Sequence, residues 1–345
     1  MFYVSDCILI AGLLVYTLLD SFVIRQTYQT VEAHTVSAVT AEPFTANSDS
    51  SEPSTANSES SETSSNKKRH SSGGGSGRGT SARQRTSTAE TEKTEILDLS
   101  SSGTSSYSDE NIRIDITEYT CSDTEIYVAD VRLSSIDYLY AAFADNAYGK
   151  NVTDETSSIA EQNSAILAVN GDYYGARNSG YVLRNGTLYR DSVSSSDQED
   201  LVINADGSFS IITEGKTGAS DIASSGALQV FSFGPALITD GEISVSVSDE
   251  VGKAKASNPR TAICEIEPLH YLFVVADGRT DESEGLSLYE LAQFLQENFE
   301  IKTAYNLDGG GSSTMVFQGQ LVNNPTTSGS RISERSVSDV ICIGY

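Results

Sequence analysis

The sequence Asn306-Leu307-Asp308-Gly309-Gly310-Gly311-Ser312-Ser313-Thr314 stands between two short apolar runs, 303–307 and 315–317, which are typical of strands. This order predicts that the Asp308 carboxylate lies at a strand end and is followed by a glycine loop. Glycine permits positive φ and close approach of a ligand to the backbone, and successive amide groups can form a concave anion site. The stretch therefore fits a tight turn as well as a site for phosphate or carboxylate.

Two more carboxylates, Asp172 and Asp277, also follow apolar runs directly and are themselves followed by glycine within three residues. Loops at strand ends are common places for ligand sites. The guanidinium group suits bidentate recognition of phosphate, and three arginines occupy comparable positions, namely Arg260, Arg279 and Arg335. Each of these residues taken alone also fits a turn aspartate or a surface ion pair, so the prediction of a site rests on the repeated pattern.

The composition excludes several classes of function. Acidic residues number 48 against 22 basic ones, for a net charge of −26, which argues against nucleic acid as a partner because phosphate backbones require basic surface. Such acidity fits a secreted or surface protein. Of the 3 histidines, only His270 lies beyond the N-terminal region, and we assign it a structural role. A multi-histidine zinc site is excluded, and catalysis is expected to depend on carboxylates.

The N-terminal region contains the apolar run Cys7–Ile24, whose length is at the lower limit for spanning a bilayer. It lacks the basic start and the small-residue cleavage site of a signal peptide. We therefore predict that residues 1–40 hold an uncleaved membrane anchor, with a cleaved signal as the alternative, and that the protein sits in the cell membrane with its domain outside. Arg25, just after the run, argues against this orientation under the positive-inside rule.

Residues 41–106 are rich in Ser, Thr, Glu and Gly and contain few apolar side chains. Such a segment cannot bury enough surface to offset the entropy of ordering, so it is predicted to be a disordered linker. Its basic patch, Lys67-Lys68-Arg69, fits a solvated linker charge run or a contact with a membrane surface or wall polymer.

Residues 107–345 show the patterns of one folded α+β domain. We predict a strand-rich domain with a mixed central sheet and flanking helices, a hairpin at Asn185-Gly186, and a helix over Leu286–Phe299 with one apolar face.

Five segments and a terminal Glu334-Arg335 occur in an order that closely resembles the phosphodiester glycosidase family. The segments are Asn170–Tyr174, Phe233–Leu237, Asn258–Ala262, Asp277–Arg279 and Asn306–Ser313. The resemblance covers roughly residues 119–345 and does not extend to the predicted anchor or linker. It implies a hydrolase that releases a sugar, GlcNAc-like, from a sugar-1-phosphodiester in a glycan or an exopolysaccharide.

The resemblance also implies functional residues. Asp308 and the loop Gly309, Gly310, Gly311 and Ser312 match an Asp-Gly-Gly-Gly-Ser signature, and Arg260, Asp277, Arg279, Glu290 and Arg335 match further family positions. Cys264 stands where glycine is expected, which leaves the packing of that strand open. We expect Asp308 and Asp172 to act on the sugar, and Asp277 and Glu290 to orient the site or bind a cation. Arg260, Arg279, Arg335 and the glycine loop are expected to hold the phosphate.

Glycoside cleavage commonly uses two carboxylates, and the sequence leaves open which one is nucleophile, acid or base. No cofactor is predicted to be required, and Ca²⁺ is the candidate cation because it prefers several oxygen ligands, which this acidic domain can supply. Two alternatives stay open at this point. One is a non-catalytic surface module that binds phosphorylated glycan, and the other is a structural domain stabilised by Ca²⁺.

Overall fold

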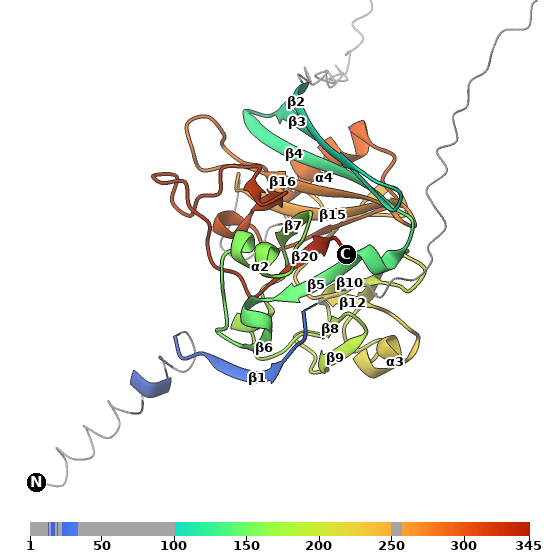
Figure 1. Ribbon diagram of the computed structural model, residues 1–345, viewed down its shortest axis with the longest axis vertical. Helices are drawn as coiled ribbons and strands as arrows, with labels where there is room; N and C mark the ends of the chain where they lie inside the picture. The colour runs from blue at the N-terminus through green and yellow to red at the C-terminus, as the bar shows by residue number, and fades with distance from the viewer. Residues whose placement is uncertain (1–12, 14, 18, 20–22, 34–100, 250–256) are drawn as a thin grey trace, which may run out of the picture. The chain divides into compact units, whose positions relative to one another are not determined.

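The computed structural model describes residues 13, 15–17, 19, 23–33, 101–249 and 257–345, and Figure 1 shows its strands arranged in several sheets with few helices. The strand-rich α+β prediction is thereby confirmed. The predicted mixed central sheet is wrong, because the named strands pair only in antiparallel fashion. A parallel pair requires a long crossover, usually a helix, and the described chain contains few helices of any length.

The largest sheet has eight strands, and two of the three predicted strand-end carboxylates, Asp277 and Asp308, follow its strands. Its central strands are apolar and completely buried along most of their length, as expected for strands covered on both faces. In spatial order the strands are β14 (Glu242–Ile243), β13 (Ala236–Thr239), β17 (Thr303–Asn306), β15 (Arg260–Glu267), β16 (His270–Ala276), β4 (Thr124–Leu133), β3 (Ile112–Cys121) and β2 (Ser101–Ser108).

Two further sheets have five strands each. The first runs in the order β19 (Gln320–Leu321), β18 (Met315–Phe317), β7 (Leu167–Asn170), β20 (Asp339–Ile343) and β5 (Leu139–Phe143). The second runs in the order β11 (Phe209–Thr213), β10 (Glu199–Ile203), β12 (Gln229–Phe231), β8 (Val182–Arg184) and β9 (Thr187–Arg190). The last two strands form the predicted hairpin, and Asn185 and Gly186 adopt the positive φ values of 51° and 75° that its turn requires.

The three large sheets share one hydrophobic core. It contains Ile114 of the eight-stranded sheet, Val169 of β7 and Phe231 of β12, each with 0% exposure. Cys264 is also fully buried in β15, opposite Leu272 and Ala304, so the strand accommodates the small thiol side chain where glycine is expected.

The helices cover the sheets. Helix α2 (Thr156–Gln162) packs through Ile159 and Ala160 onto the sheet that contains β7 and β20 (Figure 1), and α3 (Ala219–Ser224) covers the hairpin sheet. Helix α4 (Leu288–Asn298) confirms the predicted helix within two residues at its start. It begins with a capping box in which the Ser287 side chain accepts from the Glu290 amide and the Glu290 carboxylate accepts from the Ser287 amide.

The N-terminal predictions are only partly covered by the described residues. Most of the apolar run Cys7–Ile24 and of the linker lies outside them. Within them no helix is long and apolar enough to cross a membrane. Strand β1 (Gln26–Thr30) pairs with β6 (Ala147–Lys150), and β2 begins at Ser101. Strand β2 thus starts six residues before the predicted domain boundary at 107, and 101–106 pair along β3.

A pair of buried carboxyl groups, Asp200 and Glu214, predicts how stability depends on pH. Burial, and then the charge of Glu214, raise the pKa of Asp200 to about 9. The folded state therefore holds a proton that the unfolded state releases near pH 4, and the free energy of unfolding falls as pH rises from about 4 to about 9. We expect Asp200→Asn to raise Tm at pH 8 and to change it less at pH 5.

Thermal unfolding of both proteins across pH 5–9 measures this effect. Asp206→Asn is the matched control, because Asp206 is an exposed turn residue and its replacement should not produce the same rise. A Tm difference between Asp200→Asn and wild type that stays constant over this pH range would contradict the assignment of a proton to Asp200.

Candidate functional site

The buried side-chain amide of Asn170 connects three of the sequence segments, 170–174, 258–262 and 306–313. Asn170, at the end of β7, donates from Nδ2 to the carbonyl of Asp308 at 2.6 Å. Its Oδ1 accepts from Thr261 Oγ1 at 2.8 Å and from the Thr314 amide at 3.3 Å. The Asp308 amide donates to the carbonyl of Gly171 at 3.3 Å. The ends of β7 and β17 therefore lie side by side, and Asp308 is fixed to both.

The Asp308 carboxylate lies in a cavity of about 390 Å³. Its Oδ2 accepts from Ser312 Oγ at 2.7 Å and from Arg335 Nη2 at 2.8 Å. Burial raises the pKa of Asp308, and the neighbouring Arg335 charge opposes that rise. The cavity is lined by Val23, Arg25, Asn151, Thr153, Asp172, Tyr173, Gly175, Ala176, Asp308, Arg335, Ser336, Val337 and Ser338.

The glycine loop after Asp308 is a short turn of 3₁₀ helix over Gly310–Ser312. Gly310 has a φ of 62°, and a Cβ there would lie 2.8 Å from Arg279 Nη2. A Cβ on Gly309 would lie 2.9 Å from the carbonyl oxygen of Pro259. A side chain at either position would displace the arginine or the backbone, so the glycines allow Arg279 to approach the turn.

Arg335 is the cation that contacts Asp308 in the cavity. Its Nε and Nη2 donate to Ser312 Oγ at 2.8 and 2.6 Å, and Nη2 also reaches the Gly309 carbonyl at 3.2 Å. Among the described residues no acceptor is found for Nη1, and the side chain is 39% exposed. The guanidinium is thus held in place on one edge and keeps donor capacity for a ligand on the other.

Arg279 lies next to Gly310 in the glycine turn, and its guanidinium binds two neighbouring loops. Its Nη1 donates to the Thr327 carbonyl at 2.6 Å, and its Nη2 donates to Asn258 Oδ1 at 3.0 Å. Burial and then the charge of Arg335 lower the pKa of Arg279. Its backbone φ of 66° is uncommon outside glycine. Arg279 thus lies beside the glycine turn, with Arg335 nearer to Asp308, and its predicted role in holding the phosphate stays a prediction.

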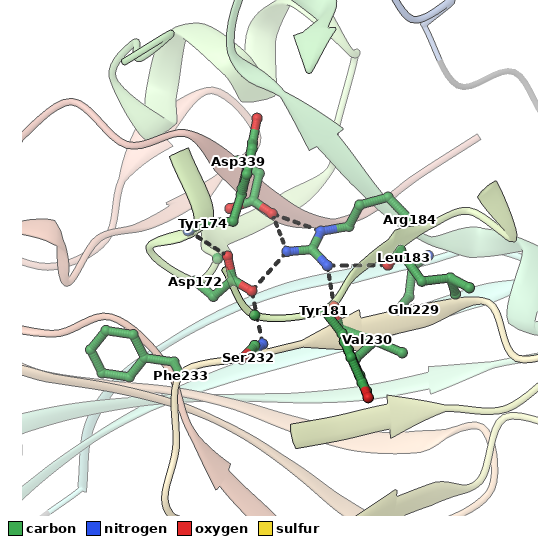
Figure 2. A network of polar contacts seen from close by, with 12 residues as sticks. Asp172, Tyr174, Tyr181, Leu183, Arg184, Gln229, Val230, Ser232, Phe233 and Asp339 are labelled. Carbon is green, nitrogen blue, oxygen red and sulfur yellow. Dashed lines mark hydrogen bonds and ion pairs between the residues drawn. The ribbon is translucent and has the colours of Figure 1, made fainter. Parts of the chain in front are cut away.

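Asp172 lines the same cavity, but its carboxylate points into the domain and is 0% exposed. Figure 2 shows that Oδ2 accepts from Arg184 Nη2 and from the Ser232 amide, both at 2.9 Å, and that Oδ1 accepts from the Tyr174 amide. Three donors thus hold this buried carboxylate in place as an anchor. Its predicted role toward the sugar stays a prediction.

Three other predicted residues lie away from the cavity. Asp277 accepts from Asn323 Nδ2 at 2.8 Å and from the Asn324 amide at 3.0 Å, so it fixes the loop after β19. Arg260 is buried and donates from Nε to the Leu286 carbonyl at 2.7 Å. Glu290 caps α4. None of the three is among the cavity-lining residues, and each has a structural partner that explains its place.

The sequence analysis did not single out Arg184, Asp339 or Tyr173. Arg184 Nη2 lies 2.9 Å from Asp172 and 2.8 Å from Asp339, and all three side chains are 0% exposed (Figure 2). Two features of the sequence could have indicated this pair: Arg184 directly follows the apolar run 181–183, and Asp339 opens the last apolar run of the chain. Charged residues in such runs need a buried partner.

An N-terminal segment, residues 23–31, lies against the cavity. Val23 and Arg25 contribute to its lining. Arg25 Nη1 pairs with Asp145 at 2.5 Å, Nη2 donates to the Thr153 carbonyl at 2.5 Å, and the Ile24 carbonyl accepts from Asn151. We call residues 23–31 the N-terminal strap. Its strand β1 continues the contact along β6.

In this arrangement the Asp308 carboxylate can stabilise a developing positive charge, and Arg335, which lies beside the glycine turn, can bind an anion. Within the described residues, no three His, Cys, Asp or Glu side chains are grouped so as to hold a metal ion.

Comparison with known proteins gives a consistent picture. The sequence profile described as phosphodiester glycosidase matches residues 163–344. The chain is 27% identical over 205 residues to the SPbeta prophage-derived protein YomE of Bacillus subtilis (strain 168), covering 57% of this chain and 31% of that protein. It is 38% identical over 87 residues to N-acetylglucosamine-1-phosphodiester alpha-N-acetylglucosaminidase of Mus musculus, covering 24% and 16%. The chain thus spans well under two thirds of either relative.

Among solved structures, the zebrafish N-acetylglucosamine-1-phosphodiester alpha-N-acetylglucosaminidase catalytic domain, auto-inhibited by its pro-peptide, superposes with a TM-score of 0.52. The two chains are 21% identical, and the match covers 73% of this chain and 85% of that one. This similarity shows a shared fold.

Proposed function

Because the chain belongs to the phosphodiester glycosidase family, we propose that it hydrolyses the bond between the anomeric carbon of a sugar and the phosphate of a sugar-1-phosphodiester. The substrate is a phosphorylated glycan or polysaccharide, and the names of the vertebrate relatives favour a GlcNAc-like sugar. The observation that carries the proposal is the Asp308–Arg335 pair, which places a carboxylate and a guanidinium 2.8 Å apart in one cavity beside a glycine turn.

The pair suits this bond because its cleavage separates charge. The C1–O bond breaks with its electrons going to the bridging oxygen, which leaves as part of a phosphate monoester, while positive charge develops on the sugar. Asp308 faces the positive side, and Arg335 Nη1 faces the negative side. Water supplies the hydroxyl group that ends on C1, and its remaining proton passes to solvent.

A phosphate leaving group also explains why the cavity holds one open carboxylate. An ordinary glycosidase needs an acid to protonate its leaving alkoxide, and the second carboxylate usually does this work. A phosphate monoester leaves as a stable anion and needs neutralisation more than a proton. The enclosure of Asp172 is therefore compatible with the proposed reaction.

The direct test is incubation of the protein with a methyl phosphodiester of GlcNAc-1-phosphate. We expect free GlcNAc and methyl phosphate in equal amounts, measured by NMR. A protein that binds this compound without releasing sugar would instead be the phosphoglycan-binding module considered as the alternative.

We also propose that the strap limits access to the cavity. Arg25 holds the strap through one ion pair and one backbone acceptor, and the zebrafish relative is described as auto-inhibited by a pro-peptide.

We expect Arg25→Glu to raise kcat/KM several-fold, because the new carboxylate repels Asp145 and releases the strap. The rise is limited to several-fold because an exposed ion pair contributes only up to about 1 kcal/mol. Arg113→Glu, which breaks the comparable pair with Asp115, is the control and should change nothing; a rise in both variants would contradict a specific role for the strap.

The location of the enzyme rests on the sequence. The apolar run Cys7–Ile24 supports a membrane anchor with the domain outside the cell, and this stays a prediction because most of that run lies outside the described residues.

A further inference from the structure

Tyr173 is an exposed aromatic residue whose two neighbours in sequence, Asp172 and Tyr174, are buried. Tyr173 is one of the residues that line the cavity with Asp308 and Arg335, and it is 46% exposed, whereas Asp172 and Tyr174 on either side are each 2% exposed. A tyrosine so exposed contributes little to the core. Ligand cavities commonly use aromatic side chains as contact surfaces, so its position invites a functional explanation.

The backbone that carries Tyr173 is fixed on both sides. On one side, the Asp172 carboxylate is held by Arg184, which is itself held by Asp339 (Figure 2). On the other side, the Tyr174 ring is stacked on Tyr148 with centroids 5.4 Å apart.

The anchoring extends to the neighbouring strands. Arg184 Nη1 donates to the Val230 carbonyl, and the Ser232 amide donates to Asp172. Such a support keeps the Tyr173 backbone in one position before a ligand arrives, and binding then requires little further ordering.

A pyranose ring has an apolar face of C–H groups and an edge of hydroxyl groups. A tyrosine ring offers a large apolar surface with two rotatable bonds, and among the described residues that line this cavity no other is aromatic. Resting on the proposed function, we propose that the sugar ring packs on the Tyr173 ring while its anomeric carbon lies beside Asp308. Tyr173 is then a specificity-determining residue that selects a cyclic sugar with an uninterrupted apolar face.

The test uses the full chain with Tyr173→Ala, Tyr173→Phe and the control Tyr345→Ala. Tyr345 is 44% exposed and is not among the cavity-lining residues. With methyl GlcNAc-1-phosphodiester we expect Tyr173→Ala to lower kcat/KM tenfold or more, mainly through KM, because the lost contact is made before the bond breaks. Tyr173→Phe should stay within about threefold of wild type, and the Tm of each Tyr173 variant should stay near that of wild type because the side chain is half exposed.

A binding measurement makes the result independent of turnover. The probes are a non-hydrolysable GlcNAc C-phosphonate methyl ester and an acyclic polyol phosphonate of the same charge. We expect Tyr173→Ala to weaken binding of the cyclic probe about tenfold and to leave the acyclic probe unchanged.

If Tyr173→Ala weakened binding of both probes equally, or did not weaken binding of the cyclic probe, the proposed packing of the sugar ring on Tyr173 would be overturned. A loss in Tyr173→Phe as large as that in Tyr173→Ala would also overturn it, because the hydroxyl group would then be the functional part. If wild type binds the cyclic probe but releases no sugar from the substrate, the proposed function fails and the probe comparison still decides the role of Tyr173.

Discussion

Asp308→Asn is expected to lower kcat/KM for a sugar-1-phosphodiester by about 10³-fold or more, which corresponds to roughly 4 kcal/mol of transition-state stabilisation. Asparagine keeps the shape of the side chain and can still accept from Ser312, but it removes the negative charge that faces the developing positive charge on the sugar. The fold should survive, because burial already disfavours the charged form of Asp308 and its backbone bonds to Asn170 and Gly171 are unaffected.

Asp277→Asn is the matched control for this experiment. Asp277 is also a buried carboxylate directly after a strand, but it binds Asn323 and Asn324 and is not among the cavity-lining residues. We expect it to lower Tm while folded enzyme keeps kcat near the wild-type value. If Asp308→Asn instead retained activity, or lost it only in step with a large fall in Tm, Asp308 would be a structural turn residue.

Arg335→Lys is expected to reduce turnover of the phosphodiester by roughly 10²-fold, the scale of losing one preorganised donor to a developing anion. Lysine keeps the positive charge, but it cannot bind Ser312 and Asp308 with one edge and a phosphate oxygen with the other. An aryl glycoside of the same sugar, where the enzyme accepts it, has no phosphate to bind. Its turnover should fall much less, so the ratio of kcat/KM for the two substrates should change.

Arg260→Lys provides the contrast. Arg260 is buried and bound to the Leu286 carbonyl, so its replacement should lower Tm and affect both substrates to the same extent. If Arg335→Lys also reduced both substrates equally, Arg335 would support Asp308 and the loop, and its assignment to the phosphate would be withdrawn.

The sequence was sufficient for features that depend on local chemistry. The Asn-Gly dipeptide at 185–186 predicts its hairpin because few other residues adopt two consecutive positive φ values. The apolar face of 286–299 predicts α4. The Asp308 loop is predicted as a site because a carboxylate and three glycines follow an apolar run. In the structure Asp308 lies two residues after β17, and its glycines leave room for Arg279.

The direction of a strand-end carboxylate could not be predicted in this way. Asp172 and Asp308 have the same local pattern, yet one points into the domain and the other into the cavity. The difference comes from Arg184, a residue on another strand that is buried beside Asp172. Glu290 illustrates a related limit, since a capping box explains its acidic side chain as well as a site does.

The location of the oxygen atom taken from water tests the central claim most directly. Hydrolysis of methyl GlcNAc-1-phosphodiester in H₂¹⁸O by the full chain, followed by mass spectrometry of both products and corrected for exchange at the free sugar, reports which bond breaks. The account predicts ¹⁸O on C1 of the released sugar and unlabelled methyl phosphate. Label in the phosphate product, or release of GlcNAc-1-phosphate and methanol, would show cleavage at phosphorus and would contradict the account.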